Sequence, residues 1–532
     1  MKKNNTPSNR PQDALFQLIK SLGKAEKRNF KLFVGRNTNT GDLKITQLFD
    51  LLDKMPDYDE PALFRKGSGL KKEQLPNLKS NLYRQILSSL RVLREEVNVE
   101  VQLHEQLEYA RILYDKGLYQ QSLRMLERTK EMARTYHQNS FLLQALVFEK
   151  KIESLHITRS MRHRAEEISS EVRMLNERLA MIGRLSNLAL QLYSRYIHYG
   201  HARNENDIES AREFFTSLLP TQPINEGFFE RLYLYQAYCW YAFIAQDFLL
   251  HYRYSRKWVD LFISHPQMQR VETPYYIKGV YNLLLAHFML RNDEKFEEEL
   301  ALFEIFAASE LATSNENVRA QTFIYLNISR INGYFMRGDF KGGLTLAPEI
   351  EQYLEEYHLQ IDRHRELVFY YKIACLHFGS GDFNNTIAYL NRIIHWKVDL
   401  RSDLQCYARL LHLITHYELG NYGILEHLIK SVYRFMSKME NLSIVEEEIF
   451  RFIRKSFQLT NAARIRAAFV ALQEKLIRCE SNPLESRSFM YLDIIGWLEG
   501  KISGKPLNEV IRDRRKRAGT RLSARTSVRR KG

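Results

Sequence analysis

The sequence contains little proline, and the few prolines leave three long stretches without any. The chain of 532 residues has 12 prolines, and none occurs in 77–219, 275–347 or 349–482. Proline inside a helix removes a hydrogen bond and clashes with the preceding turn, so a long stretch without it favours helix. The sequence therefore predicts an all-α protein.

Cysteine and long apolar runs are also scarce. The four cysteines form no close pair, so we expect reduced thiols inside the fold. The most apolar stretches, such as 282–290, are far shorter than the roughly 20 residues that span a bilayer. The first 14 residues carry lysines without a following apolar core, which is unlike a secretory leader. We therefore expect no membrane insertion and a cytoplasmic location.

Familiar catalytic motifs are missing as well. The sequence has no phosphate-binding loop, no dinucleotide-binding glycine motif and no His-Glu-x-x-His. The helical pairs His412/His416 and His198/His201 have a spacing that can hold a metal, but neither pair has an evident third ligand. We expect no enzymatic activity, no cofactor, no metal site and no small-molecule substrate.

The net charge of +15 is concentrated at the two ends of the chain. Residues 1–100 hold 19 basic and 12 acidic side chains, and residues 501–532 hold 12 and 2. The 400 residues between them hold 47 and 49, so they are nearly neutral. This distribution separates basic termini from a long neutral middle.

Helical periodicity and turn residues divide the chain further. We expect a disordered leader over 1–12, a small helical domain over 13–100 and helical-hairpin repeats over 101–440. Helices over 441–510 are expected to cap the array, because an end repeat must cover its neighbour's core. The last segment, 511–532, is predicted to begin as a helix and to continue as a flexible basic tail.

A turn followed by an aromatic residue recurs through the middle of the chain. It occurs as Lys116-Gly117-Leu118-Tyr119, Arg337-Gly338-Asp339-Phe340, Ser380-Gly381-Asp382-Phe383 and Leu419-Gly420-Asn421-Tyr422, with weaker copies at Asn206-Asp207-Ile208, Gln246-Asp247-Phe248 and Glu294-Lys295-Phe296. From Ile208 onward the spacing is 39–48 residues, which is close to the period of helical-hairpin repeats. Each copy is expected to join two helices.

These turns resemble the junction between the two helices of a tetratricopeptide repeat. The resemblance covers about 101–440 and implies an α-solenoid of about eight or nine antiparallel hairpins. The N-terminal residues 15–31 also resemble the start of uncharacterised bacterial repeat proteins of similar length. The small residues expected after the aromatic are partly replaced, for example by Leu425, and no proline closes the units.

In tetratricopeptide repeats the first helices usually line a concave groove that holds a ligand. Aligning the units on the turn places seven residues toward such a groove: Tyr233, Gln236, Trp240, Tyr325, Asn332, Tyr371 and Tyr407. Tyrosine and tryptophan suit recognition surfaces because they combine apolar area with a polar tip. The alternative is that these side chains fill the space between hairpins.

The tail is the other candidate binding segment. Its basic residues are Arg512, Arg514, Arg515, Lys516, Arg517, Arg521, Arg525, Arg529, Arg530 and Lys531. Such a segment attracts phosphate-rich polymers by counterion release, although basic tails can also lack a specific role. The leading hypothesis is a non-enzymatic scaffold that binds a peptide or protein partner in its groove. The alternative is a regulator that contacts nucleic acid or the ribosome through its basic ends.

Overall fold

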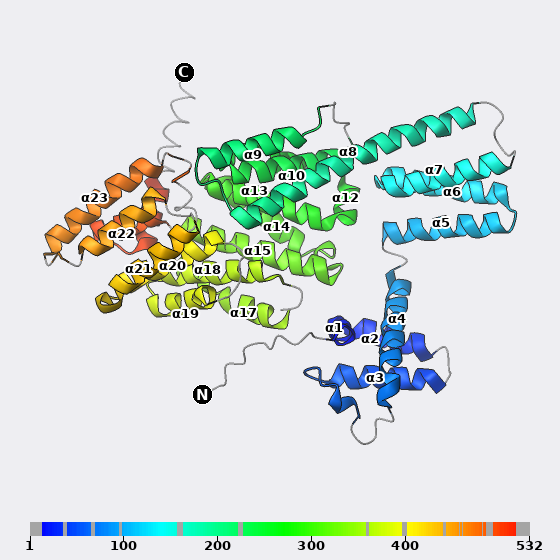
Figure 1. Ribbon diagram of the computed structural model, residues 1–532, viewed down its shortest axis with the longest axis horizontal. Helices are drawn as coiled ribbons and strands as arrows, with labels where there is room; N and C mark the ends of the chain where they lie inside the picture. Colours follow the sequence, from blue (N-terminus) through cyan, green and yellow to red (C-terminus); the bar gives the residue numbers. More distant parts are fainter. Residues whose placement is uncertain are drawn as a thin grey trace. The chain divides into compact units, whose positions relative to one another are not determined.

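A computed structural model describes most of the chain (Figure 1). The described residues are 13–35, 40–64, 70–94, 98–156, 163–221, 227–357, 361–395, 402–439, 443–456, 458–459, 461–480, 482, 484–485 and 493–517. They form α-helices with a few short 3-10 helices, and none of them lies in a β-strand. The predicted all-α class is confirmed. No helix in these ranges is long and apolar enough to cross a membrane.

The chain divides into two compact units, Met1–Ala165 and Glu166–Gly532. The elements of the first are α1 (Ala14–Ser21), α2 (Lys24–Gly35), α3 (Thr40–Lys54), η1 (Pro61–Phe64), η2 (Lys72–Gln74), α4 (Leu75–Arg94), α5 (Val99–Asp115), α6 (Tyr119–Thr135) and α7 (Asn139–Leu155). The division falls within the predicted repeat region and not at residue 100. Helices α1 to α4 nevertheless share a hydrophobic cluster of their own, which includes Ile19, Phe30 and Phe49.

Helices α5, α6 and α7 pack against one another in chain order. Between α6 and α7 lies an ion pair that is almost fully buried, because the side chains of Lys130 and Glu149 are each 1% exposed. Arg164, at the start of α8 (Arg164–Tyr199), donates to the same carboxylate. Burial by itself would raise the pKa of Glu149, but hydrogen bonds from Lys130 and Arg164 outweigh it and lower that pKa.

The second unit contains the remaining helices. They are α9 (Glu205–Leu218), α10 (Phe228–Ile244), α11 (Phe248–Ser264), α12 (Pro266–Val271), α13 (Thr273–Met289), α14 (Asp293–Ala307), η3 (Leu311–Thr313), α15 (Glu316–Arg337), α16 (Phe340–Leu344), α17 (Ala347–Glu356), α18 (Arg363–Ser380), α19 (Phe383–Ile394), α20 (Ser402–Glu418), α21 (Tyr422–Lys438), α22 (Ile444–Ser456), α23 (Ala462–Glu480) and α25 (Ile494–Ser503). A last helix spans 507–517.

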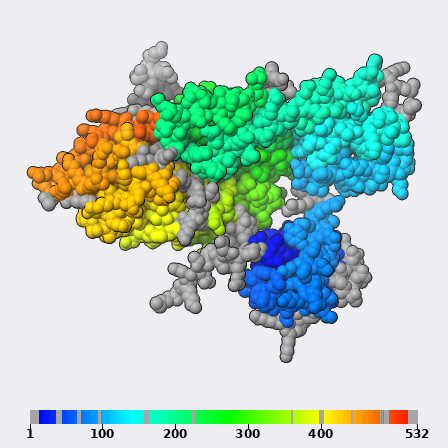
Figure 2. Space-filling view, in the orientation of Figure 1, coloured from blue at the N-terminus to red at the C-terminus, as the bar shows by residue number. Residues whose placement is uncertain are grey.

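Neighbouring helices of this unit pack in a regular order. Helix α10 contacts α11, α11 contacts α13, and α13 contacts α15. The order continues through α15 to α18, and from α18 through α19 and α20 to α21. A hydrophobic cluster runs from Val259 to Ile511 through this series. The segments of this unit run from green to orange in the space-filling view (Figure 2).

The predicted turns end their helices through left-handed backbone. Gly117, Gly338, Gly381 and Gly420 all have φ between 63° and 85°, a conformation that glycine adopts without steric cost. The aspartate that follows Gly338 or Gly381 caps the next helix. Asp339 Oδ1 accepts from the Gly342 amide at 3.2 Å, and Asp382 Oδ1 accepts from the Asn385 amide at 3.2 Å.

The weaker copies differ among themselves. Gln246 has φ 59° and precedes α11 in the predicted way. The copies at 206–208 and 294–296 do not form turns, because they lie in the first turns of α9 and α14. Before α14 the left-handed residue is Arg291, with φ 54°. An arginine in this conformation gives no glycine signal, so the sequence places that junction a few residues too late.

Candidate functional site

The three predicted groove residues of α10 lie in different surroundings. The Trp240 side chain is partly exposed, and its ring centroid is 4.8 Å from that of Tyr193 on α8. Gln236 is 5% exposed, and its Nε2 atom has no hydrogen-bond partner among the described residues. Tyr233 is partly buried and faces Tyr275 of α13, with ring centroids 6.0 Å apart. Burial raises the pKa of Tyr233.

The two predicted residues of α15 each meet a cation from α18. The hydroxyl of Tyr325 accepts a hydrogen bond of 2.8 Å from Arg365, whose guanidinium also lies 5.2 Å from the ring centroid. Asn332 Oδ1 accepts a hydrogen bond of 2.6 Å from Lys372 Nζ. Tyr325 and Asn332 are 8% and 2% exposed. They lie seven residues apart, so they share one face of α15.

The last two predicted groove residues are interior side chains. Tyr371 and Tyr407 are 3% and 4% exposed and belong to the large hydrophobic cluster of the second unit. Burial raises the pKa of Tyr371 well above its usual value, and Cys375 and Tyr407 lie nearby. For these two tyrosines the structure supports the alternative in which the ring fills space between helices.

Sequence analysis missed the cations that lie beside these residues. Lys278 of α13 extends over two rings, with Nζ 4.9 Å from the Tyr193 centroid and 5.2 Å from the Trp240 centroid. Lys372 of α18 lies 5.9 Å from the Phe288 centroid and 5.4 Å from the Phe335 centroid. Lys278, Arg365 and Lys372, here called the cation cluster, are all partly exposed.

The surroundings of the two lysines disfavour their charged form. Burial, followed by the positive charge of Arg365, lowers the pKa of Lys278 to about 8, although Cys239 opposes the shift. Burial likewise lowers the pKa of Lys372 to about 8. In the sequence, each lysine interrupts an apolar helical run, 275–280 and 369–374. That interruption is the signal that could have identified them.

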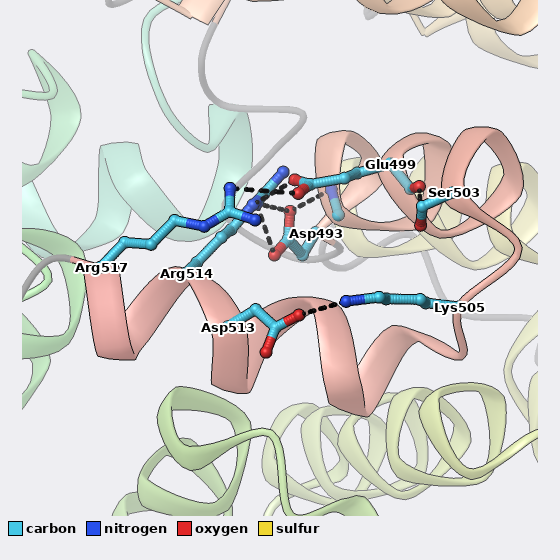
Figure 3. A network of polar contacts seen from close by, with 8 residues as sticks. Asp493, Glu499, Ser503, Lys505, Asp513, Arg514 and Arg517 are labelled. Carbon is cyan, nitrogen blue, oxygen red and sulfur yellow. Dashed lines mark hydrogen bonds and ion pairs between the residues drawn. The ribbon is translucent and has the colours of Figure 1, made fainter.

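The described part of the predicted tail, 511–517, belongs to the helix 507–517, which packs on the rest of the unit. Its buried apolar residues are Val510 and Ile511. Figure 3 shows Arg514 between two carboxylates, with contacts of 2.7 Å to Glu499 and 3.3 Å to Asp493. Arg514 therefore takes part in holding this helix to α25 and the residue that caps it.

Three more arginines of this helix approach acidic side chains. Arg515 pairs with Asp293 at 3.0 Å, Arg512 approaches Asp339 to 3.9 Å, and Arg517 approaches Glu499 to 3.9 Å. The sequence suggested that nearby acids were too few to neutralise the tail, but partners come from distant segments. The remaining predicted tail residues, Arg521, Arg525, Arg529, Arg530 and Lys531, lie outside the described residues.

An open cavity of about 790 Å³ lies between this C-terminal region and the turns that precede α16 and α19. Phe340, Phe383 and Trp497 line it together with Glu418 and Lys501. Glu418 accepts from Trp497 Nε1 at 2.6 Å and pairs with Lys501 at 2.9 Å. At this cavity, the contacts of Glu418 with Trp497 and Lys501 connect α20 to α25.

No group of three metal-ligating side chains occurs within the part of the chain that the structure describes. His412 and His416 do lie together, with their Nε2 atoms 3.3 Å apart. Burial and the neighbouring His416 lower the pKa of His412 to about 4. The four cysteines are free thiols, and Cys239, Cys375 and Cys406 are buried.

Comparison with models of protein families, with curated proteins and with solved structures finds no match to this chain.

Proposed function

We propose that this chain is a cytoplasmic, non-enzymatic scaffold that binds a peptide or protein partner on a face made by α10, α13, α15 and α18. In this proposal the helices form a tetratricopeptide-like array, and the first helices of successive units supply the binding face. A small-molecule substrate, a cofactor and a metal have no part in it.

The repeat interpretation is supported by the turns. Left-handed residues before α6, α11, α14, α16, α19 and α21 end one helix and allow the next to return beside it. Stacked hairpins contact mainly their neighbours, which agrees with the packing order of the second unit. Such arrays provide extended surfaces for partners.

One observation supports the choice of the face made by α10, α13, α15 and α18. Three predicted groove residues on α10 and α15 each contact a cation that comes from another helix: Trp240 with Lys278, Tyr325 with Arg365, and Asn332 with Lys372. Tryptophan, tyrosine and arginine, three of the residue types on this face, are the ones that most often dominate binding energy at protein interfaces. The face therefore carries side chains that are common at binding sites, and its cations are partly exposed to a partner.

The nucleic-acid alternative receives less support. Four of the described tail arginines lie near carboxylates, and Arg514 contacts two of them. Binding to nucleic acid is favoured by the release of small counterions from the phosphates. A cation that already has a protein counter-ion neutralises phosphate less well, so it releases fewer of these ions. We therefore treat nucleic-acid binding as an outcome of the experiment and not as a second proposal.

The test is capture of the tagged chain from its own cells with and without nuclease, followed by hydrogen exchange of the captured complex. We expect a protein partner that survives nuclease and moderate salt. We also expect slower amide exchange in 228–244, 273–289, 316–337 and 363–380 when that partner is bound. Loss of every partner after nuclease, or protection confined to other helices, would overturn the proposal.

A further inference from the structure

The partly exposed cation cluster has few negative charges beside it. Among the described residues, no carboxylate lies within ion-pair distance of Lys278 or Lys372, and the only such partner of Arg365 is the exposed Asp362 at 2.7 Å. In place of counter-ions the lysines have aromatic rings and the amide oxygen of Asn332. Three positive charges thus share one face with a single peripheral negative charge.

Two other buried charges of the chain have counter-ions, whereas Arg409, like the two lysines, lies over a ring, that of Phe435, and donates to carbonyl oxygens. Glu230 is fully buried and accepts from Arg178 at 2.5 Å. Lys130, in the first unit, has Glu149 beside it, and both are buried. A desolvated charge without a counter-ion is costly, so stability alone would favour an apolar side chain or an added carboxylate. The unpaired state of Lys278 and Lys372 is therefore evidence for a charge that arrives from outside.

The aromatic rings beside the cation cluster indicate which class of ligand it binds. Binding to single-stranded nucleic acid uses free aromatic faces on which bases stack. Here one face of Trp240 and one face of Tyr325 already carry a cation of the same chain, Lys278 and Arg365. The middle of the chain is also nearly neutral, so it lacks the broad positive field that a long polyanion favours. A short segment with a few carboxylates fits this local cluster better.

We propose that the cation cluster binds the carboxylates of an acidic segment of a partner protein. The inference rests on the function proposed above and specifies its ligand. Carboxylates placed beside Lys278, Arg365 and Lys372 would supply the missing counter-ions through charge-assisted hydrogen bonds, which are stronger than neutral ones.

The experiment compares a short fluorescent polyglutamate peptide with the matching polyglutamine peptide, using the full-length chain. The test variant combines Lys278→Met with Lys372→Met. The control combines Lys430→Met with Lys438→Met, two exposed lysines of α21, and so removes the same charge. We expect the polyglutamate affinity of the test variant to fall by about tenfold or more while the control stays within about twofold of wild type.

The basic ends of the chain can also attract polyglutamate, so the contact must be located. A photo-crosslinkable form of the peptide should label segments 273–289 and 363–380 in wild type, and this labelling should disappear in the test variant. Equal affinity in the test variant and wild type, or equal affinity for polyglutamine, would overturn the inference. So would labelling restricted to the termini, or cluster-dependent binding of oligothymidylate in preference to polyglutamate.

The two proposals can fail separately. If a captured partner protects the four helices but binds the test variant as well as wild type, the face is a binding site and its ligand is not acidic. If no partner protects these helices, the proposed function fails as well. Circular dichroism and the unfolding transition of the test variant should match wild type or exceed it, which excludes misfolding as the cause of lost binding.

Discussion

Lys278 and Lys372 are the residues whose chemistry is least explained by the fold itself. Each amine is close to aromatic rings, and the charge of Lys372 is met by a neutral oxygen of Asn332 at 2.6 Å. Cation–π contacts and one amide oxygen compensate a lysine less completely than a carboxylate does. The lowered pKa values of the two lysines reflect this incomplete compensation. They make the stability of the fold depend on pH.

Stability of the second unit should rise as pH increases from about 7 to about 8.5. The folded lysines lose protons near pH 8, whereas unfolded lysine keeps its proton up to a pKa of about 10.4. The unfolded state then binds more protons, so the free energy of unfolding increases with pH, by at most about 1.4 kcal/mol per lysine for each pH unit. Urea unfolding at successive pH values measures this slope.

The groups that face the lysines set the limits of that window. Arg365 and Cys239 face Lys278, and Cys375 lies near Lys372. Burial raises the pKa of both cysteines to about 12, whereas unfolded cysteine loses its proton at about pH 8.5, so the cysteines lower the stability of the folded state as pH rises above about 8. The variant with Lys278→Met and Lys372→Met should have a flatter slope. An equal slope in that variant and wild type would show that these lysines do not cause it.

Removal of the buried carboxylate of Glu149 should lower stability, unlike removal of the charges of Lys278 and Lys372. Glu149→Gln leaves Lys130 buried without its main counter-ion, and we expect a loss of about 3 kcal/mol in the first unit. Amide exchange in α6 and α7 measures that loss. The control Glu108→Gln removes an exposed pair with Arg111 at 3.4 Å and should change exchange little. Similar exchange in both variants would contradict a stabilising role for the buried pair.

At this scale, three of the residues predicted for a groove lie beside the cations. Trp240, Tyr325 and Asn332 lie on the face that carries the cations, whereas Tyr371 is interior. Neighbouring helical residues point about 100° apart, so a shift of one position exchanges Tyr371 for Lys372. Periodicity cannot resolve such a shift when both faces of a helix are largely apolar. Sequence analysis also selected aromatic residues and gave no weight to single lysines in apolar runs.

At the scale of elements, the turns were the most predictable feature. Glycine followed by aspartate has a local physical cause, because glycine allows positive φ and aspartate caps the next helix. The sequence therefore located the junctions at Gly338 and Gly381. It misplaced the junction before α14, where Arg291 adopts the same backbone conformation without a glycine.

Two of these glycines have the same backbone conformation and different surroundings. A Cβ at Gly338 would lie 3.0 Å from the carbonyl oxygen of Asn508 and from Ile511, whereas one at Gly381 would meet nothing. Gly381→Ala should therefore cost only the strain of positive φ, about 1 kcal/mol. Gly338→Ala should cost more, and it should also loosen the helix 507–517 as measured by amide exchange. Equal effects of the two substitutions would contradict this packing.

At the scale of the whole chain, the two basic ends were evident from composition, but the role of the C-terminal arginines was not. Ion pairs such as Arg515 with Asp293 join residues more than 200 positions apart, and no local pattern predicts such contacts. The division into two units at residue 165 has no local signal in the sequence either. Periodicity continues across that point, because α8 runs from Arg164 to Tyr199.

Truncation tests which part of the C-terminal segment belongs to the fold. Removal of 507–532 takes away Val510, Ile511 and the ion pairs of Arg514, and it should lower the unfolding midpoint of the second unit. Removal of 518–532 keeps all of these groups and should leave the midpoint unchanged. Calorimetry of the two truncated chains distinguishes them. An equal loss from both would show that the helix 507–517 contributes nothing to stability.

The most direct test of the central claim asks whether the cation cluster serves the fold or a ligand. It is the unfolding free energy of the variant with Lys278→Met and Lys372→Met, measured near neutral pH beside the Lys430→Met and Lys438→Met control. If the cluster serves a ligand, the test variant should be as stable as wild type or more stable, by up to about 4 kcal/mol. A loss of stability clearly larger than in the control would mean that the lysines hold the fold together, and it would contradict the account.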